Sequence, residues 1–171
     1  MYIDIGKGYC IRTFLTEDKS SLTRHANNIK IAGKLRDVFP HPYLEEDARE
    51  WINLATTSSP QTHFAIASET ECIGCIGLTL QEDIFSHSAE IGFWLGEEFW
   101  GKGITSNACR KLIEYGFTEL GLTRIFAYVF ADNSASIKVL QKSGMLREGI
   151  LKKGVHKNDV FHDTILFAIT K

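Results

Sequence analysis

The stretch SAEIGFWLGEEFWGKGIT, residues 88–105, joins two hydrophobic patterns. Residues 88–95 alternate like a strand, whereas from Gly103 to Leu120 the apolar residues recur at helical spacing. The glycines between the two patterns predict a tight turn, and Gly121 suits the end of the helix. Because a further strand is predicted from Thr123 to Phe130, this part of the chain predicts a strand-helix-strand crossover.

Elements on both sides of the crossover predict an α+β fold with a largely antiparallel sheet. Thr16 is predicted to cap a helix, and further helices are predicted at Lys30–Val38 and Leu44–Leu54. Asn133 is predicted to cap a helix that ends at Gly144. The other predicted strands are Tyr9–Leu15, His63–Ser68, Cys72–Gln81, Met145–Leu151 and Val160–Ile169, with a polar loop at Lys152–Asp159 between the last two.

The composition is that of a single domain spanning residues 1–171. The 171 residues are 44% hydrophobic and 23% charged, enough for one core and too few to suggest two. The net charge of -2 removes the usual electrostatic argument for binding nucleic acid or a membrane surface. We find neither an export signal in the first thirty residues nor a long apolar segment, and we expect a cytoplasmic protein.

Cys72 and Cys75 form a C-I-G-C spacing, which also occurs in redox pairs and in halves of zinc sites. They lie in a mostly apolar strand, without a second CxxC, a nearby histidine or a helix start that would lower a thiol pKa. We interpret the pair as buried and inert, and we expect no metal site. Cys109, in the following helix, is not expected to be a nucleophile.

The segment Gly96–Thr105 comes within one residue of GxxxxGK[ST], the phosphate loop of nucleotide hydrolases. That loop needs a Ser or Thr after its Lys, and Gly103 stands there instead. Residues 97–100 are two glutamates, which would oppose a triphosphate, and two bulky aromatics. Read as a turn and a helix start, the segment predicts a more general anion site, because glycines let the backbone approach the ligand and the first helix amides are unpaired donors. A pyrophosphate would fit there, with Lys102 adding a partly solvated charge.

Motifs spaced along nearly the whole chain occur together in one known family. They are Phe39-Pro-His-Pro-Tyr43, Glu46-Asp-Ala48, Trp51-Ile52, Ala89-Glu-Ile-Gly-Phe-Trp-Leu95, Trp100-Gly-Lys-Gly-Ile-Thr105, Asn133-Ser-Ala-Ser136, Lys142-Ser-Gly144 and Phe161-His-Asp163. With these motifs the sequence resembles the GNAT N-acetyltransferases, and within them the ribosomal-protein N-terminal acetyltransferase (RimJ/RimL-like) branch. The resemblance implies a three-layer fold with a mixed, mostly antiparallel central sheet and flanking helices, and acetyl-CoA as co-substrate.

The resemblance also implies how acetyl-CoA would bind. The family loop [QR]-x-x-G-x-[GA] falls on Trp100, Gly103 and Thr105, and the first and last of these depart from it. Since the loop binds pyrophosphate through backbone amides, these departures concern side-chain contacts more than binding. The pantetheine would lie beside the strand end like an extra strand. The implied cofactor residues are Phe93, Trp94, Leu95, Trp100, Gly101, Lys102, Gly103, Ile104, Thr105 and Asn133.

Glu90 and Ser136 are the catalytic candidates. Glu90 lies on the strand that leads to the thioester, where related enzymes often keep a carboxylate; it is either the general base or a solvated strand residue. Ser136 follows Asn133 by one helical turn, and in the resembled branch a Ser there is thought to hydrogen-bond the CoA sulfur or pass it a proton; otherwise it is a surface serine. The wider family often has a Tyr acid at the position of Leu140, so Ser136 or water is left to supply the proton.

Two histidines could also relay protons, since the imidazole pKa lies near the right range. His156 lies in a lysine-rich segment, and an isolated histidine is more often not a catalyst. His162-Asp163 matches the family pattern, where Asp163 could instead fix strand or loop backbone. The roles of these three residues stay open at this point.

The expected function is direct acetyl transfer from acetyl-CoA to a primary amine in a ternary complex. The favoured acceptor is a protein or peptide N-terminus, as the resembled branch implies. Two alternatives remain: a small amine, such as a polyamine or an amine-bearing antibiotic, and a non-catalytic GNAT module that binds acyl-CoA as a signal. The sequence determines neither the acceptor nor the oligomeric state.

Overall fold

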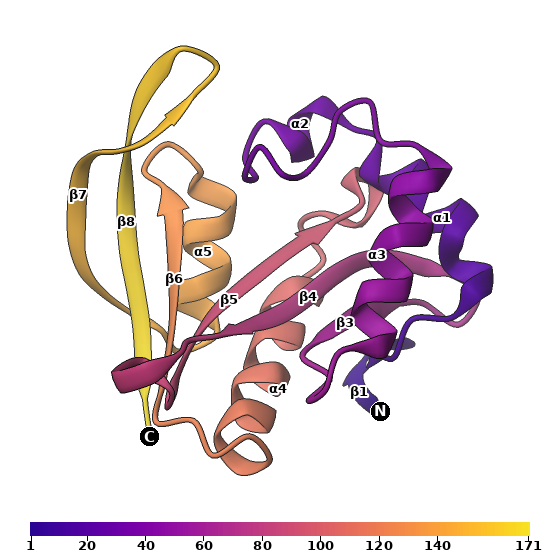
Figure 1. Cartoon of the computed structure of the whole chain (residues 1–171), viewed down its shortest axis with the longest axis horizontal. Helices are drawn as coiled ribbons and strands as arrows, with labels where there is room; N and C mark the ends of the chain where they lie inside the picture. The colour runs from indigo at the N-terminus through magenta and orange to yellow at the C-terminus, as the bar shows by residue number, and fades with distance from the viewer. The chain divides into compact units, whose positions relative to one another are not determined.

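The computed structural model describes residues 1–171, which divide into two compact units. The first unit comprises residues 1–77 and 93–108, and the second comprises residues 78–92 and 109–171. Figure 1 labels the helices and strands of both units. No helix of the chain is both long and apolar enough to cross a membrane.

The first unit is built from an antiparallel run of strands and a group of helices. Strands β1, β2, β3 and β4 pair in that order, each antiparallel to the next. Helices α1 and α3 lie side by side (Figure 1). The bounds are β1 Tyr2–Gly6, β2 Tyr9–Arg12, the 3-10 turn η1 Thr16–Asp18, α1 Lys19–Ala26, α2 Ile29–Ala32, α3 Glu45–Thr57, β3 His63–Ala67, β4 Cys72–Leu80 and the 3-10 turn η3 Glu97–Phe99.

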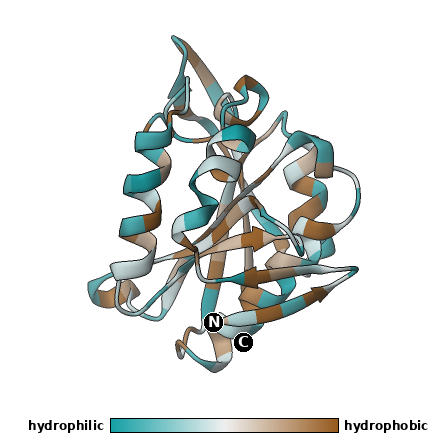
Figure 2. Ribbon diagram, turned by 90° about the vertical axis from the view of Figure 1, so that its right-hand side faces the viewer, coloured by the Kyte–Doolittle hydropathy of each residue, from teal (hydrophilic) through white to brown (hydrophobic).

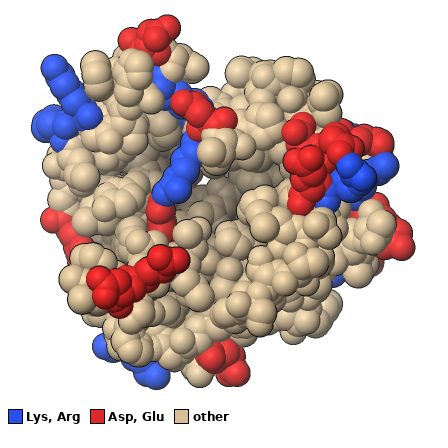
Figure 3. Space-filling model, viewed as in Figure 1, with Lys and Arg blue, Asp and Glu red and all other residues tan.

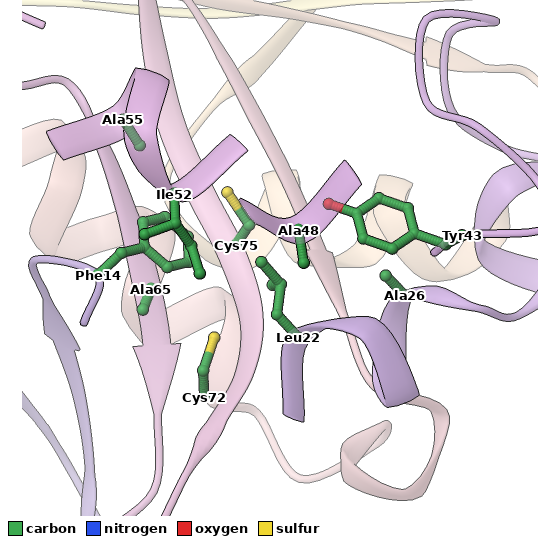
Figure 4. Close-up of a cluster of buried hydrophobic side chains, with 10 residues drawn as sticks. All are labelled: Phe14, Leu22, Ala26, Tyr43, Ala48, Ile52, Ala55, Ala65, Cys72 and Cys75. Carbon is green, nitrogen blue, oxygen red and sulfur yellow. The ribbon is translucent and has the colours of Figure 1, made fainter. Parts of the chain in front are cut away.

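The core of the first unit lies between its helices and its strands. Figure 4 shows Leu22 of α1 and Ala48 and Ile52 of α3 among side chains of β3 and β4, including Ala65 and Cys72. All five side chains are buried. Burial of apolar surface of this kind contributes about 25 cal/mol per Å² and holds the helices on the sheet.

The second unit contains the parallel pair of strands. Its strands follow the order β5-β6-β8-β7; β5 and β6 are parallel, with Ala89 opposite Ile125, and the other pairs are antiparallel. Figure 2 shows short apolar and polar stretches mixed along the elements. The bounds are the 3-10 turn η2 Asp83–Phe85, β5 Ser88–Leu95, α4 Ile104–Thr118, β6 Arg124–Phe130, α5 Ser134–Lys142, β7 Leu146–Lys157 and β8 Val160–Thr170. Residues 93–95 of β5 and 104–108 of α4 belong to the first unit. The predicted strand-helix-strand crossover is confirmed as β5-α4-β6.

Near the N-terminus one strand was missed and two predictions are wrong. Strand β1 was not predicted, because its five residues give too short a pattern. Leu15, and not Thr16, precedes the first helical turn, and its backbone N–H donates to Oδ2 of Asp18 at 2.8 Å. The helix predicted over Lys30–Val38 is the short α2, after which the chain turns, as in the Phe39 N–H bond to the Arg36 carbonyl.

The polar loop predicted at Lys152–Asp159 is also wrong. Strand β7 runs to Lys157 and pairs with β8, leaving Asn158 and Asp159 as a two-residue turn with φ of 51° and 59°. Most side chains of β7 are exposed, so polar residues are compatible with this strand, which lies last in the strand order. Polarity therefore did not distinguish a loop from an exposed strand.

Candidate functional site

The glycine loop, residues 100–105, has the backbone that an anion site needs. Gly101 and Gly103 have φ of 76° and 81°, the left-handed region that side chains disfavour. A Cβ built at either glycine would meet nothing within 4 Å, so conformation rather than crowding requires glycine. The open space leaves the loop backbone accessible to a ligand.

Helix α4 begins directly after this loop. The Asn107 N–H donates to the Gly103 carbonyl at 3.1 Å, and the N–H groups of the preceding turn have no acceptor within the helix. Thr105 and Ser106 are buried, and the Asn107 side chain donates to the Ile5 carbonyl at 3.1 Å, which ties the helix start to β1. A fixed helix N-terminus with unpaired donors attracts phosphate groups.

The two acidic residues before the loop are paired with groups from the early helices. Glu97 accepts hydrogen bonds from Lys30 and from the Asn28 side chain, the latter at 2.8 Å, and the Lys30 hydrogen bond, followed by that of Asn28, lowers the pKa of Glu97. Oε1 of Glu98 lies 3.4 Å from Nδ1 of His25. The Lys30 contact partly offsets the charge of Glu97, which from the sequence was expected to oppose a phosphate.

Trp100 and Lys102 line the loop. The Trp100 indole N–H donates to the Leu95 carbonyl at 2.7 Å, while the side chain stays 44% exposed. Trp100 therefore connects the loop to the end of β5. The family pattern has Gln or Arg at this position. Nζ of Lys102 lies 5.1 Å from the centre of the Phe99 ring, a cation–π contact of an exposed lysine.

The side chains at the end of β5 are buried or half-buried. Trp94 packs edge-on against Phe39, with ring centres 5.9 Å apart, and both lie against the core of the first unit. The Leu95 side chain is buried, and Phe93 is half-buried.

Asn133 and Ser136 lie together at the start of α5, in the second unit. Oδ1 of Asn133 accepts the Ser136 backbone N–H at 3.1 Å, so the predicted cap is confirmed. The Ser136 side chain is half-buried in the first turn of the helix. The cap uses the side-chain oxygen of Asn133 and leaves the amide nitrogen as the group that could donate to a ligand.

Glu90 lies on a different element from Ser136. It is half-buried on β5, where its partner across the parallel pair is Phe126 of β6. The catalytic roles of both residues remain predictions.

Asp163 fixes a bulge in β7. Its carboxylate accepts hydrogen bonds from Nζ of Lys152 at 2.7 Å and from the Lys153 backbone N–H at 2.9 Å, and the Lys152 hydrogen bond, followed by that of Lys153, lowers the pKa of Asp163. Lys153 has a φ of 52°, and the register of β7 against β8 shifts between Leu151 and Val155. This geometry supports the structural role for Asp163.

The two C-terminal histidines pack against aromatic rings. His162 lies edge-on to Phe130, with ring centres 5.3 Å apart, and His156 lies 4.7 Å from Phe161. A shallow cavity of about 360 Å³ is lined by Ala131, Asp132, Phe161, His162 and Asp163. Of the two histidines, only His162 therefore lines this cavity.

The cysteines lie in the interior of the protein. All four cysteines are free and buried, and burial raises the pKa of Cys72 to about 12. The structure has no group of three or more His, Cys, Asp or Glu residues that could hold a metal ion. On the face shown in Figure 3, acidic and basic residues are interspersed.

Sequence reasoning missed the residues that hold the acidic turn. Asn28 could have been found as a helix cap, since its side-chain oxygen accepts the Lys30 N–H at 2.9 Å. Its second role, the hydrogen bond to Glu97, joins residues 69 positions apart and leaves no local pattern. The contact between His25 and Glu98 is equally invisible in the sequence.

Comparison with known domains decides the family. The family described as "Acetyltransferase (GNAT) domain" matches residues 9–146, well over half of the chain. The chain belongs to the GNAT acetyltransferase family. The α+β fold class and the resemblance to this family, both expected from the sequence, are thereby confirmed.

Named relatives and solved structures agree with the GNAT assignment. The chain is 33% identical over 165 residues to the uncharacterized N-acetyltransferase p20 of Bacillus licheniformis, covering 94% of this chain and 92% of the relative. It is 40% identical over 89 residues to the putative ribosomal N-acetyltransferase YdaF of Bacillus subtilis. This match covers 52% of this chain and about half (49%) of YdaF. A GNAT acetyltransferase structure from Bacillus anthracis superposes with a TM-score of 0.84 at 26% identity and covers 99% of this chain and 98% of its own.

Proposed function

We propose that this GNAT protein transfers an acetyl group from acetyl-CoA to a primary amine, with a protein N-terminal α-amine as the favoured acceptor. The observation that carries the proposal is the glycine loop at the start of α4, with open space before two left-handed glycines and its neighbouring glutamates paired elsewhere. Residues 100–105 would bind the pyrophosphate, and residues 93–95 and Asn133 would bind the pantetheine.

In the proposed reaction, the neutral amine attacks the thioester carbonyl carbon directly. The C–N bond forms, the oxyanion collapses, the C–S bond breaks, and the CoA thiolate takes up a proton. Ser136 would pass a proton to the sulfur and regain one from water, and Glu90, directly or through water, would accept the proton that the amine loses. No acyl-enzyme is formed in this scheme, in agreement with the buried cysteines.

The chemistry of the acceptor favours an N-terminal amine. An α-amine of pKa about 8 is deprotonated at pH ~7.5 for less than about 1 kcal/mol, whereas a lysine-like amine costs about 4 kcal/mol. A half-buried glutamate or a water chain is sufficient to deprotonate the α-amine. The proposal includes a cytoplasmic location, where newly made proteins present such amines.

Relatives supply independent support for this acceptor. The ribosomal-protein-serine acetyltransferase of Escherichia coli is 36% identical over 105 residues, covering 61% of this chain and 58% of that protein. The name of the putative ribosomal N-acetyltransferase YdaF supports the same class of acceptor. We therefore place protein N-termini before small amines.

Thermal unfolding with acetyl-CoA, and separately with Mg-ATP, tests the cofactor first. A ligand present at about a hundred times its Kd adds about 2.7 kcal/mol, which is roughly 5 to 10 °C for a chain of this size. We expect the shift with acetyl-CoA only. A shift with Mg-ATP alone would show that the glycine loop binds nucleotide triphosphates and would overturn the proposal.

The acceptor is then tested by mass spectrometry. Peptides with free and with blocked α-amines, and polyamines as the competing class, are incubated with the protein and acetyl-CoA. Acetylation of free N-termini alone is the expected result. Acetylation of polyamines alone would replace the proposed acceptor and keep the reaction, while acetyl-CoA binding without transfer to any amine would favour the non-catalytic module.

A further inference from the structure

His25 in α1 is a buried polar side chain that the proposed chemistry does not use. It is 5% exposed. Its Nδ1 lies 3.4 Å from Oε1 of Glu98 in η3, and its Nε2 lies 3.5 Å from Oε1 of Glu71, just before β4. The guanidinium of Arg24, from the same helix, lies 3.3 Å from Nε2. Two carboxylates and one cation therefore face the imidazole.

The two ring nitrogens of His25 face different kinds of polar groups. Nδ1 faces Glu98, and an ionised carboxylate can only accept a hydrogen bond. Nε2 faces both Arg24, which only donates, and Glu71, which accepts. Nε2 can accept from Arg24 in the neutral imidazole or donate to Glu71 in the charged form. In both cases Nδ1 stays in polar contact with Oε1 of Glu98, at 3.4 Å.

The ring of His25 also supports the backbone before the glycine loop. Phe99 packs edge-on against it, with ring centres 5.5 Å apart. A Cβ at Gly96 would lie 2.8 Å from Nδ1, so the chain passes directly against the imidazole. Phe99 in turn contacts Lys102 of the glycine loop. A continuous set of contacts therefore leads from α1 to the loop within the first unit.

We propose that His25 is a positioning residue for the glycine loop. It holds the turn at residues 96–99 through Glu98, Phe99 and Gly96, and so keeps Gly101 and Gly103 in the conformation that presents backbone amides to a pyrophosphate. That this ligand is CoA rests on the proposed function. That His25 holds the loop in place does not depend on which ligand binds. His25 itself touches no reacting atom.

A matched pair of variants at Glu98 isolates this contact. The side chain of Glu98 is 68% exposed, so changes there should leave the fold intact. Glu98→Gln removes the charge and keeps a polar side-chain oxygen next to Nδ1, whereas Glu98→Leu removes both. Amide hydrogen exchange of residues 96–103 measures the loop without any ligand, and calorimetric titration with CoA measures the consequence for binding.

We expect the loop amides to exchange about tenfold faster in Glu98→Leu than in Glu98→Gln, and CoA to bind about fivefold more weakly. In a His25→Phe background, which keeps an aromatic ring, the Gln and Leu variants should no longer differ. His63→Phe is the control, because His63 is also partly buried in the first unit but packs against Trp51. It should leave the exchange of residues 96–103 unchanged.

Two results would overturn the role of His25. One is equal exchange in the Gln and Leu variants, and the other is a difference between them that persists without the imidazole. If the exchange data follow the expectation but the unaltered protein binds no CoA, the positioning role stands and the proposed function fails. The two hypotheses are therefore separated by the same experiment.

Discussion

At the scale of single residues, Ser136 can be changed without disturbing its helix. The Asn133 cap bonds to the backbone N–H of Ser136 and not to its hydroxyl, so an alanine keeps the cap. The hydroxyl is half-buried at the first turn of α5. Because the hydroxyl takes no part in the cap, removing it tests the predicted role of Ser136 as proton donor without changing the helix.

We predict that Ser136→Ala lowers kcat by about tenfold or more and leaves the KM for acetyl-CoA nearly unchanged, because general acid catalysis of this kind contributes about 10²-fold. Steady-state kinetics with the best amine acceptor measure both constants. Ser134→Ala, on the same turn but exposed, is the control and should behave like the parent. Unchanged turnover in Ser136→Ala would remove this residue from the mechanism.

Asp163 allows a prediction for acid stability. Its folded pKa is lowered by Lys152 and by the Lys153 N–H, so the unfolded chain binds the proton more readily. The stabilisation is therefore fully present above the unfolded pKa of about 3.9 and is lost as the pH falls through the lower folded pKa.

In thermal unfolding measured as a function of pH, Asp163→Asn should be less stable than the parent near neutral pH and should approach it in acid. Lys152→Met keeps the backbone bond to Asp163 and should lose only part of the pH dependence. Equal melting curves for Asp163→Asn and the parent at neutral pH would mean that the bulge does not need this carboxylate.

At the scale of elements, the segment from β5 through the glycine loop to α4 is the part that local sequence describes best. The strand bounds Ser88–Leu95 agree with the prediction, and Ile104, Ala108 and Leu112 are buried along α4 as expected. Alternation, helical period and glycine are all local signals. They predict this element without help from distant residues.

We predict that Gly103→Ala costs about 1–2 kcal/mol of stability, because an L-residue is strained at a φ of 81°. Binding of CoA should weaken as well, since relaxing this strain would move the loop amides. Gly92→Ala is the matched control: it is an exposed glycine without a left-handed φ, and its Cβ would meet nothing within 4 Å. Thermal unfolding measures the stability of both variants, and titration with CoA measures their affinity. Equal stability and equal affinity of the two variants would contradict the prediction.

The hairpin of β7 and β8 shows where local signals fail. Residues 152–159 are polar and were predicted as a loop, yet most of them extend β7. Their strand conformation depends on hydrogen bonds to β8 and on Asp163, which holds the bulge at Lys153. No periodicity within the segment contains that information.

At the scale of the whole molecule, the buried cysteines report on the intactness of the fold. Burial raises the pKa of all four thiols, and none of them is exposed. Thiolate is the reactive form, so raised pKa values and burial act in the same direction.

We predict that the native chain reacts very slowly with a thiol reagent such as DTNB near pH ~8, and that all four thiols react once the chain is unfolded by denaturant. Absorbance at the reagent's product band measures the number of reacting groups. Rapid reaction of Cys72 or Cys75 in the native chain would instead support the redox interpretation of the C-I-G-C spacing.

Sequence patterns were enough to predict the family, the crossover β5-α4-β6, the glycine loop and the Asn133 cap. Each of these depends on residues close together in the chain, through periodicity, capping or the special φ of glycine. The spaced motifs also carried the resemblance that the family match confirms.

The partners of the charged side chains are known only from the folded structure. Glu97 and Glu98 seemed from the sequence to oppose a phosphate, but they pair with Lys30 and His25, about seventy positions earlier. Trp100 departs from the family loop and yet closes it by donating to the Leu95 carbonyl. Ion pairs and hydrogen bonds depend on distance in space, and a local sequence pattern does not encode that distance.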